Sequence, residues 1–161
     1  ERTELWELEG CATGSNTVVL TWGGNITSAA GTAVSLTGVN QTTPNDANNG
    51  TTGSSAEASI AIVTVADNAW IVDTMFTEET GTSDITAGGT ASHTERQEVD
   101  ATSDNICLGT AGAITPAGST TVSWSWTGTE NWAISAASFK PSGTAVVVSF
   151  FPRRMRMGVG I

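Results

Sequence analysis

The chain has few charged residues for its length, and positive charge is the scarcest kind. Only 14% of its 161 residues are charged, and they include a single lysine, Lys140; there is also a single histidine, His93. Strong helix formers are therefore too thinly spread to build a helical bundle. With a formal net charge of −10, the chain lacks the lysine and arginine that neutralise phosphates, so we expect no nucleic-acid partner.

Long apolar runs are absent as well, and cysteine is rare. No run of about 18 apolar residues occurs, so we expect no membrane span. The two cysteines, Cys11 and Cys107, lie far apart in the chain. A disulfide between them would be worth roughly 4 to 5 kcal/mol in the chain-entropy model. The alternative is two separate small apolar residues of the core, and the sequence leaves both open.

Short runs of Val, Ile, Thr and Trp are plentiful, and Gly, Asn, Asp, Ser and Pro separate them. This pattern is typical of strands joined by tight turns, so the sequence predicts an all-β fold. The candidate strands are residues 4–9, 17–22, 33–39, 58–65, 69–76, 93–100, 105–110, 120–126, 131–139 and 144–151. Because so many strands do not fit one open sheet of this size, we expect a two-sheet antiparallel sandwich.

Two polar stretches interrupt the strands. Residues 40–58 have almost no apolar content and are predicted to be an exposed loop without a regular strand, and residues 77–93 look similar. We expect residues 1–143 to form the β-sandwich domain and residues 144–161 to form a C-terminal strand and basic arm. Because the chain starts at Glu1, with neither an initiator methionine nor a signal peptide, we expect it to be processed or cropped.

Three tryptophans, Trp124, Trp126 and Trp132, fall within nine residues. In the run TTVSWSW, a period of two places Val122, Trp124 and Trp126 on one apolar face, which predicts that they point into the core. A hairpin through 127–131 would make Trp126 and Trp132 cross-strand neighbours. The alternative is that one or more of these tryptophans is exposed as a ligand or partner contact.

Three segments carry a resemblance to known proteins: AVSLTGVNQTTPNDA (33–47), ADNAWIVD (66–73) and WAISAASFKP (132–141). They resemble a jelly-roll-like β-sandwich module that recurs in secreted bacterial and archaeal proteins and in tailed-phage virion proteins. The likeness covers about residues 5–141. It implies a fold and a context, an extracellular or virion-surface location, but no reaction and no set of functional residues.

Catalytic and metal-binding motifs are hard to find. His93 has no second histidine or serine elbow to work with, so a surface residue is the better interpretation than a catalytic base. Zinc would need more ligands than two distant cysteines and one histidine. Asp84, Asp100 and Asp104 could bind calcium, but they lack EF-hand spacing and fit solvated turns better. We therefore expect no enzyme activity and no cofactor.

The two ends of the chain carry opposite charges. Glu4, Glu7 and Glu9 lie close to the start. Four of the six basic residues lie near the end, namely Lys140 and the three arginines of FFPRRMRMGVGI. An apolar strand followed by a basic arm either pairs with its own sheet or crosses into a neighbouring subunit. The residues expected at such a subunit contact are Glu4, Glu7, Glu9, Phe150, Phe151, Arg153, Arg154 and Arg156.

These features favour a non-catalytic structural subunit of an extracellular self-assembling particle, either a virion outer protein or a surface filament. Its main partners would be copies of itself, with other virion or surface proteins as further candidates. The alternative is a carbohydrate-binding or adhesive module of a longer secreted protein, which exposed tryptophans would favour.

Overall fold

The protein is built from antiparallel strands. The structure, a computed structural model, describes residues 2–21, 23–24, 29–78, 85–100, 104–143 and 147–149, the last of these as backbone, and contains no helix in these ranges. Its strands are β1 (Ser35–Thr37), β2 (Asn45–Val63), β3 (Ala69–Thr77), β4 (Thr86–Gly89), β5 (His93–Asp100), β6 (Asn105–Ile114), β7 (Ser119–Phe139) and β8 (Val147–Ser149). The predicted all-β class is confirmed. Because the described residues contain no helix, this part of the chain has no helix that could cross a membrane.

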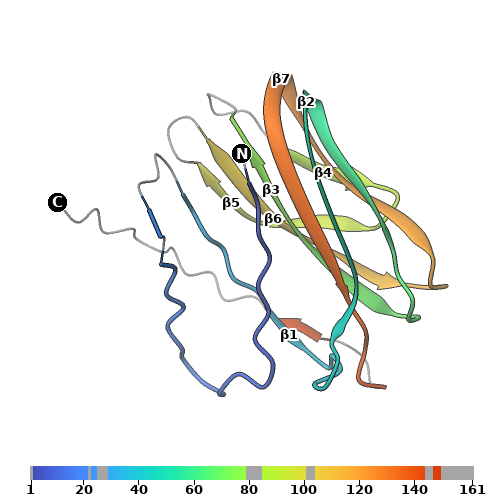
Figure 1. Ribbon diagram of the computed structural model, residues 1–161. Coiled ribbons are helices and arrows are strands. Elements are labelled where there is room, and N and C mark those ends of the chain that lie inside the picture. The colour runs from blue at the N-terminus through green and yellow to red at the C-terminus, as the bar shows by residue number, and fades with distance from the viewer. Residues whose placement is uncertain are drawn as a thin grey trace.

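Six of the strands form one sheet. Their order is β2-β7-β3-β6-β5, and β4 pairs with β7 outside this path; β1 and β8 form a separate two-stranded sheet. The second half of β7 pairs with β3, and its first half pairs with β4. The long strand β7 is therefore the element to which most of the sheet is attached (Figure 1).

The β2–β7 ribbon arches over and doubles back (Figure 1). Asn49 and Ala61 of β2 are 12 residues apart, yet the side-chain nitrogen of Asn49 donates to the Ala61 carbonyl at 2.8 Å. Along a straight strand this separation would be roughly 40 Å. The reversal falls where the ladder is irregular, between Ser55 and Glu57 of β2. One sheet thus supplies two facing layers, and a jelly-roll-like arrangement of two packed sheets stays a prediction.

The hydrophobic core lies between these layers. Ile60, Ile62 and Val122 come from the part of the ribbon beside β4, whereas Ile71 and Met75 come from β3. All five are at most 4% exposed. In the second layer, β3 and β6 are buried along nearly their whole lengths. Both of their faces are therefore covered by other parts of the protein. Continuous apolar runs, rather than alternation, are what such doubly covered strands require.

The predicted hairpin at 127–131 is wrong. β7 runs through this stretch without ending, and residues 126–129 have no Cα partner on β2 because Ser55 pairs with Glu130 and Glu57 pairs with Ser125. Gly128 has a φ of 107°, in the left-handed region that glycine adopts readily. The turn-forming residues therefore bend a strand instead of reversing the chain.

The prediction of a strand-free loop at 40–58 is also wrong. β2 begins at Asn45 and continues through this stretch with Cα partners on β7. Most side chains of its first half are exposed, since β2 is the edge of the sheet. At an edge the backbone ladder holds the strand while polar side chains reach water, so low apolar content does not exclude a strand. In the other predicted loop, 77–93, the short strand β4 is present.

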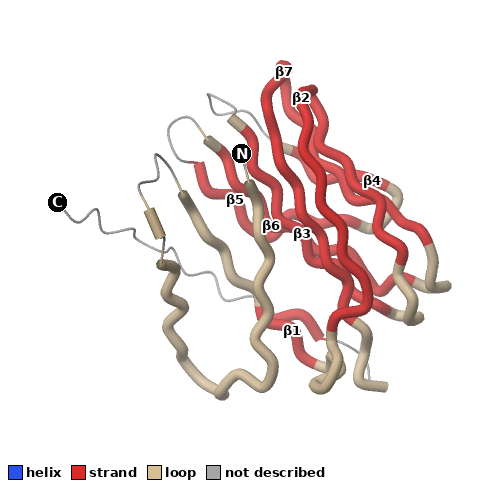
Figure 2. Tube along the Cα trace, in the orientation of Figure 1, coloured by secondary structure: helices blue, strands red, loops and turns tan. Residues whose placement is uncertain are grey.

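The first 20 or so residues are extended but belong to no ladder. The predicted strands at 4–9 and 17–22 are absent from the described part of this segment, which Figure 2 draws as a loop with two long legs beside the sheet. It is fastened at its start, where the Thr3 and Ser135 hydroxyls are 2.7 Å apart. We call residues 2–21 the N-terminal segment.

The described part of the C-terminal region pairs within its own chain. β8 lies antiparallel to β1, with Leu36 opposite Val148. This pairing uses residues 147–149 of the predicted strand 144–151 for an intramolecular contact, and it leaves no support from these residues for a crossing into a neighbour. Residues 150–161 lie outside the described residues.

Candidate functional site

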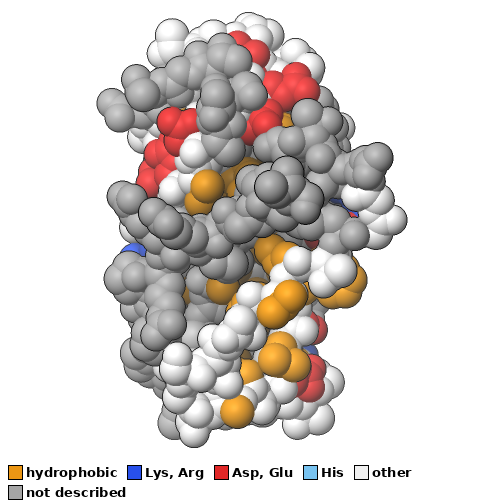
Figure 3. All heavy atoms as spheres, turned by 90° about the vertical axis from the view of Figure 1, so that its left-hand side faces the viewer, with side chains coloured by type: hydrophobic (Ala, Val, Ile, Leu, Met, Phe, Trp, Pro, Cys, Tyr) orange, Lys and Arg blue, Asp and Glu red, His pale blue; other side chains and the backbone are white. Residues whose placement is uncertain are grey.

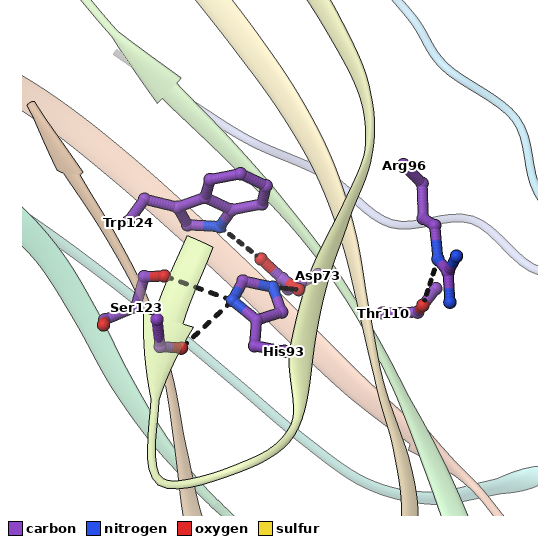
Figure 4. A network of polar contacts seen from close by, with 7 residues as sticks. Asp73, His93, Arg96, Thr110, Ser123 and Trp124 are labelled. Carbon is purple, nitrogen blue, oxygen red and sulfur yellow. Dashed lines mark hydrogen bonds and ion pairs between the residues drawn. The ribbon is translucent and has the colours of Figure 1, made fainter. Parts of the chain in front are cut away.

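The most densely connected polar group lies in the core. Asp73 of β3 is fully buried, and its two carboxylate oxygens have different partners (Figure 4). One oxygen is 2.8 Å from Nε2 of His93, on β5, and the other accepts the indole N–H of Trp124, on β7, at 2.5 Å. The imidazole and indole rings meet edge to face, with centroids 4.8 Å apart. We call Asp73, His93 and Trp124 the buried triad.

A glycine makes this arrangement possible. Gly109 of β6 lies opposite Asp73 on one side and opposite Glu95 of β5 on the other. β3 and β5 are therefore two strand spacings apart, roughly 10 Å. Because Gly109 has no side chain, the imidazole of His93 can reach across β6 to the carboxylate. A Cβ at Gly109 would lie within 3.0 Å of atoms of all three triad side chains.

The hydrogen positions in the triad follow from its acceptors. Nδ1 of His93 lies 3.1 Å from the carbonyl oxygens of both Gly88 and Ser123. Carbonyl oxygens only accept, so Nδ1 carries a hydrogen. The contact between Nε2 and Asp73 also needs one hydrogen, held by either partner. The triad thus binds β3, β4, β5 and β7 together through a shared set of hydrogen bonds.

The buried triad has no access to solvent. The side chains of Asp73 and His93 are both 0% exposed. A general base must reach its substrate, so this histidine and carboxylate form a structural network in the state seen here. The prediction that His93 is a surface residue is wrong. Its strand looks polar because β5 is an edge strand, but the first residue of that strand points inward.

The sequence contains a signal for Asp73 that the motif search missed. Asp73 is the one acid inside the otherwise apolar run AWIVDTMF. A carboxylate in a buried strand needs hydrogen-bond donors. The chain offers many, including its serines and threonines besides His93 and six tryptophans, so the run indicates a buried polar contact at Asp73 but not its partners.

A second polar link joins β5 to β6 on the far right of Figure 4. Nε of Arg96 donates to the Thr110 hydroxyl at 2.7 Å. Partial burial lowers the pKa of Arg96 by desolvation. With an ordinary value above about 12, the guanidinium still carries its charge at neutral pH.

The tryptophans of the second half lie in the core. Val122 and Trp124 are 0% exposed and Trp126 is 8% exposed, which confirms the prediction from alternation. Trp132 is also 8% exposed, and its indole N–H donates to the Ser55 hydroxyl across the ribbon at 2.9 Å. Trp126 and Trp132 lie on the same strand, not on two strands of a hairpin. None of the three offers an open stacking platform.

The N-terminal segment is where large apolar side chains are exposed. Trp6 is 86% exposed, Leu8 80% and Val19 76%, and Val18 and Leu20 are about half exposed. Figure 3 looks onto the side of the molecule where this segment lies, and hydrophobic side chains are visible there at the surface. The Trp6 indole N–H donates to Glu4 at 3.0 Å, and Glu4 also pairs with Arg2. We call Trp6, Leu8, Val18, Val19 and Leu20 the exposed apolar residues of the segment.

The remaining predicted contact residues divide into two groups. Glu4, Glu7 and Glu9 lie in the exposed N-terminal segment. The others lie outside the described residues: Phe150, Phe151, Arg153, Arg154 and Arg156. The structure therefore places one half of the expected contact, and the other half lies outside the described residues.

The predicted disulfide is not formed. Cys11 is exposed in the N-terminal segment, whereas Cys107 is fully buried on β6, opposite Met75. The two cysteines are therefore separate, and the expectation of an apolar core residue holds for Cys107 but not for Cys11.

No metal site is present among the residues that the structure describes. No group of three His, Cys, Asp or Glu side chains in that part of the chain is placed to hold an ion. Of the acids considered for calcium, Asp100 and Asp104 are described and Asp84 is not.

Comparison of the chain with models of protein families, with curated proteins and with solved structures gives no match. The resemblance to a recurrent sandwich module of secreted and phage proteins therefore stays a prediction.

Proposed function

We propose that the chain is a non-catalytic structural subunit of an extracellular self-assembling particle, either a virion outer protein or a surface filament. The observation that supports this most is the exposure of the apolar residues on the N-terminal segment. Contiguous exposed apolar surface in a folded protein commonly marks a contact with another protein. The segment pairs with no described strand, so many of its backbone groups have no partner in a ladder of the described residues.

The sequence of the segment supports the same proposal. ELWELE and TVVLT contain the aromatic and β-branched residues that favour strands, yet neither forms a ladder in the isolated chain. Trp6 has the largest exposed fraction of these residues. Tryptophan is also one of the residue types that most often dominate the binding energy of an interface.

Charge makes other copies of the chain a suitable partner. Glu4, Glu7 and Glu9 lie in the segment, and the arginines of the chain are concentrated in its last residues. Opposite charges on the two ends favour contacts between copies, and a net charge of −10 disfavours nucleic acid. The proposal includes a contact between the basic end of one copy and a neighbouring copy.

The runner-up is a carbohydrate-binding or adhesive module. Trp6 favours it, because an exposed indole can stack on a sugar ring. The burial of Trp124, Trp126 and Trp132 counts against it, since exposure of one or more of these tryptophans was the observation that would have favoured it.

Trp6→Ser is the sharpest test, and Val65→Ser is its control. Val65 is 73% exposed but lies outside the N-terminal segment. We expect Trp6→Ser to raise the concentration at half-assembly by about tenfold or more, as loss of an interface hot spot does. Static light scattering over a concentration series would measure this, with no comparable shift for Val65→Ser.

Equal assembly of Trp6→Ser and the unaltered chain would contradict the proposed role of the segment. A chain that stays monomeric and loses binding to a glycan array on Trp6→Ser substitution would instead support the carbohydrate-binding alternative.

A further inference from the structure

The two end strands of the path β2-β7-β3-β6-β5 are protected very differently. β5, at one edge, carries Glu95, Arg96, Glu98 and Asp100, and charged side chains are a common means of preventing strands from adding to an edge. β2, at the other edge, has no charged residue and no proline between Asp46 and Glu57. The β2 edge is therefore chemically open to another strand, and the β5 edge is not.

The open part of β2 is also accessible. Residues 48–52 are all exposed, as are Ser54 and Ala56. No described strand pairs with β2 other than β7. We call residues 47–56 the open edge; ten residues of strand extend over roughly 33 Å.

The same chain contains a segment suited to this edge. Residues 4–8 lie before a turn at residues 9–10, and residues 4–9 pair with no described strand. If straightened, residues 4–9 would be about 20 Å long, so they fit within the open edge. Their glutamates would meet no acidic side chain there, whereas at β5 they would face Glu95, Glu98 and Asp100. Charge therefore selects β2 over β5 as the acceptor.

We propose that residues 4–9 of one copy add as an extra strand to the open edge of β2 in the next copy. This inference rests on the proposed function and names its interface. In its own copy the segment starts from the outer side of the sheet, where Thr3 is bonded to Ser135 of β7, and it pairs with no strand. Main-chain hydrogen bonds from strand addition provide affinity, and Trp6 and Leu8 become covered.

The geometry of such a contact determines the kind of assembly. Donor and acceptor are different surfaces of the same chain, so the contact is heterologous. Two copies that exchange the segment reciprocally close into a dimer, whereas repetition of the contact from copy to copy gives a larger ring or an open filament, the outcome that the proposed function requires.

A charge reversal tests the interface. Thr51→Glu with Ser54→Glu adds two carboxylates to the open edge at exposed positions. These should repel Glu7 and Glu9 of the incoming segment, so we expect the concentration at half-assembly to rise about tenfold. Combining this pair with Glu7→Lys and Glu9→Lys should restore assembly. Thr94→Glu, at an exposed position on β5, is the matched control and should leave assembly unchanged.

The outcomes separate the interface from the proposed function. If the unaltered chain assembles and the edge variant assembles equally well, the interface is wrong and the proposed function stands. If the edge variant fails and the lysine pair does not rescue it, strand pairing with residues 4–9 is also wrong. If the unaltered chain does not assemble, both proposals fail together. Circular dichroism of each variant shows whether it has kept its fold.

Discussion

Asp73→Ala is expected to lower the free energy of unfolding by about 3 to 5 kcal/mol, because it leaves two buried polar groups without a hydrogen-bond partner. The substitution takes this partner from both His93 and Trp124, which are held against the carboxylate at 2.8 and 2.5 Å. Neither group can turn to water, because the side chain of His93 and the whole of Trp124 are fully buried. Urea unfolding followed by tryptophan fluorescence would measure the loss.

Asp73→Asn is the matched control for this prediction. An asparagine keeps the shape of the side chain, can accept from the Trp124 indole and can donate to Nε2 of a neutral His93. We expect it to cost roughly 1 to 3 kcal/mol, clearly less than alanine. Equal losses for the two variants, or a loss below 1 kcal/mol for alanine, would show that the triad contributes little to stability.

Gly109→Ala is expected to cost about 3 kcal/mol or more, although it adds only one methyl group. The new Cβ would meet Nε2 of His93, Oδ1 of Asp73 and the indole of Trp124 at once, all within 3.0 Å. Relief of these contacts requires the triad to separate, so the overpacking cost and the loss of the buried pair add together. Thermal unfolding by calorimetry would report the change as a lower Tm.

Gly50→Ala separates this effect from the general effect of placing alanine in a strand. Gly50 is also a strand glycine, but its added Cβ would meet only ordinary contacts at 3.5 Å. Since alanine also restricts the unfolded chain, this variant should be neutral or slightly stabilising. Similar losses for the two glycine variants would contradict the account of Gly109.

Much of the fold follows from local sequence pattern. The apolar run that became β3, and the strands β5 and β6, were predicted close to their observed places, because β-branched and aromatic residues there agree with the final pairing. β2 and β7 were predicted only in part, as the separate strands 58–65, 120–126 and 131–139. Asn45–Glu57 looks like a loop and 127–131 looks like a turn, but a long ladder holds both in one ribbon, which local pattern does not reveal.

The candidate site was predictable in part only. Alternation correctly placed Trp124 and Trp126 in the core, because side chains at every second position of a strand point to the same face. The partnership of Asp73 with His93 depends on Gly109, which lies on a third strand between them. A contact across two strand spacings leaves no periodic trace in the sequence. The exposure of Trp6 and Leu8 was equally hidden, because an alternating run normally indicates a paired strand.

The molar mass of the unaltered chain as a function of concentration tests the central claim most directly. Sedimentation velocity from low to high micromolar concentration, without denaturant, would give it. As a self-assembling subunit, the 16.5 kDa chain should form particles of many times that mass, increasing with concentration. A single monomeric species across the whole range would contradict the account.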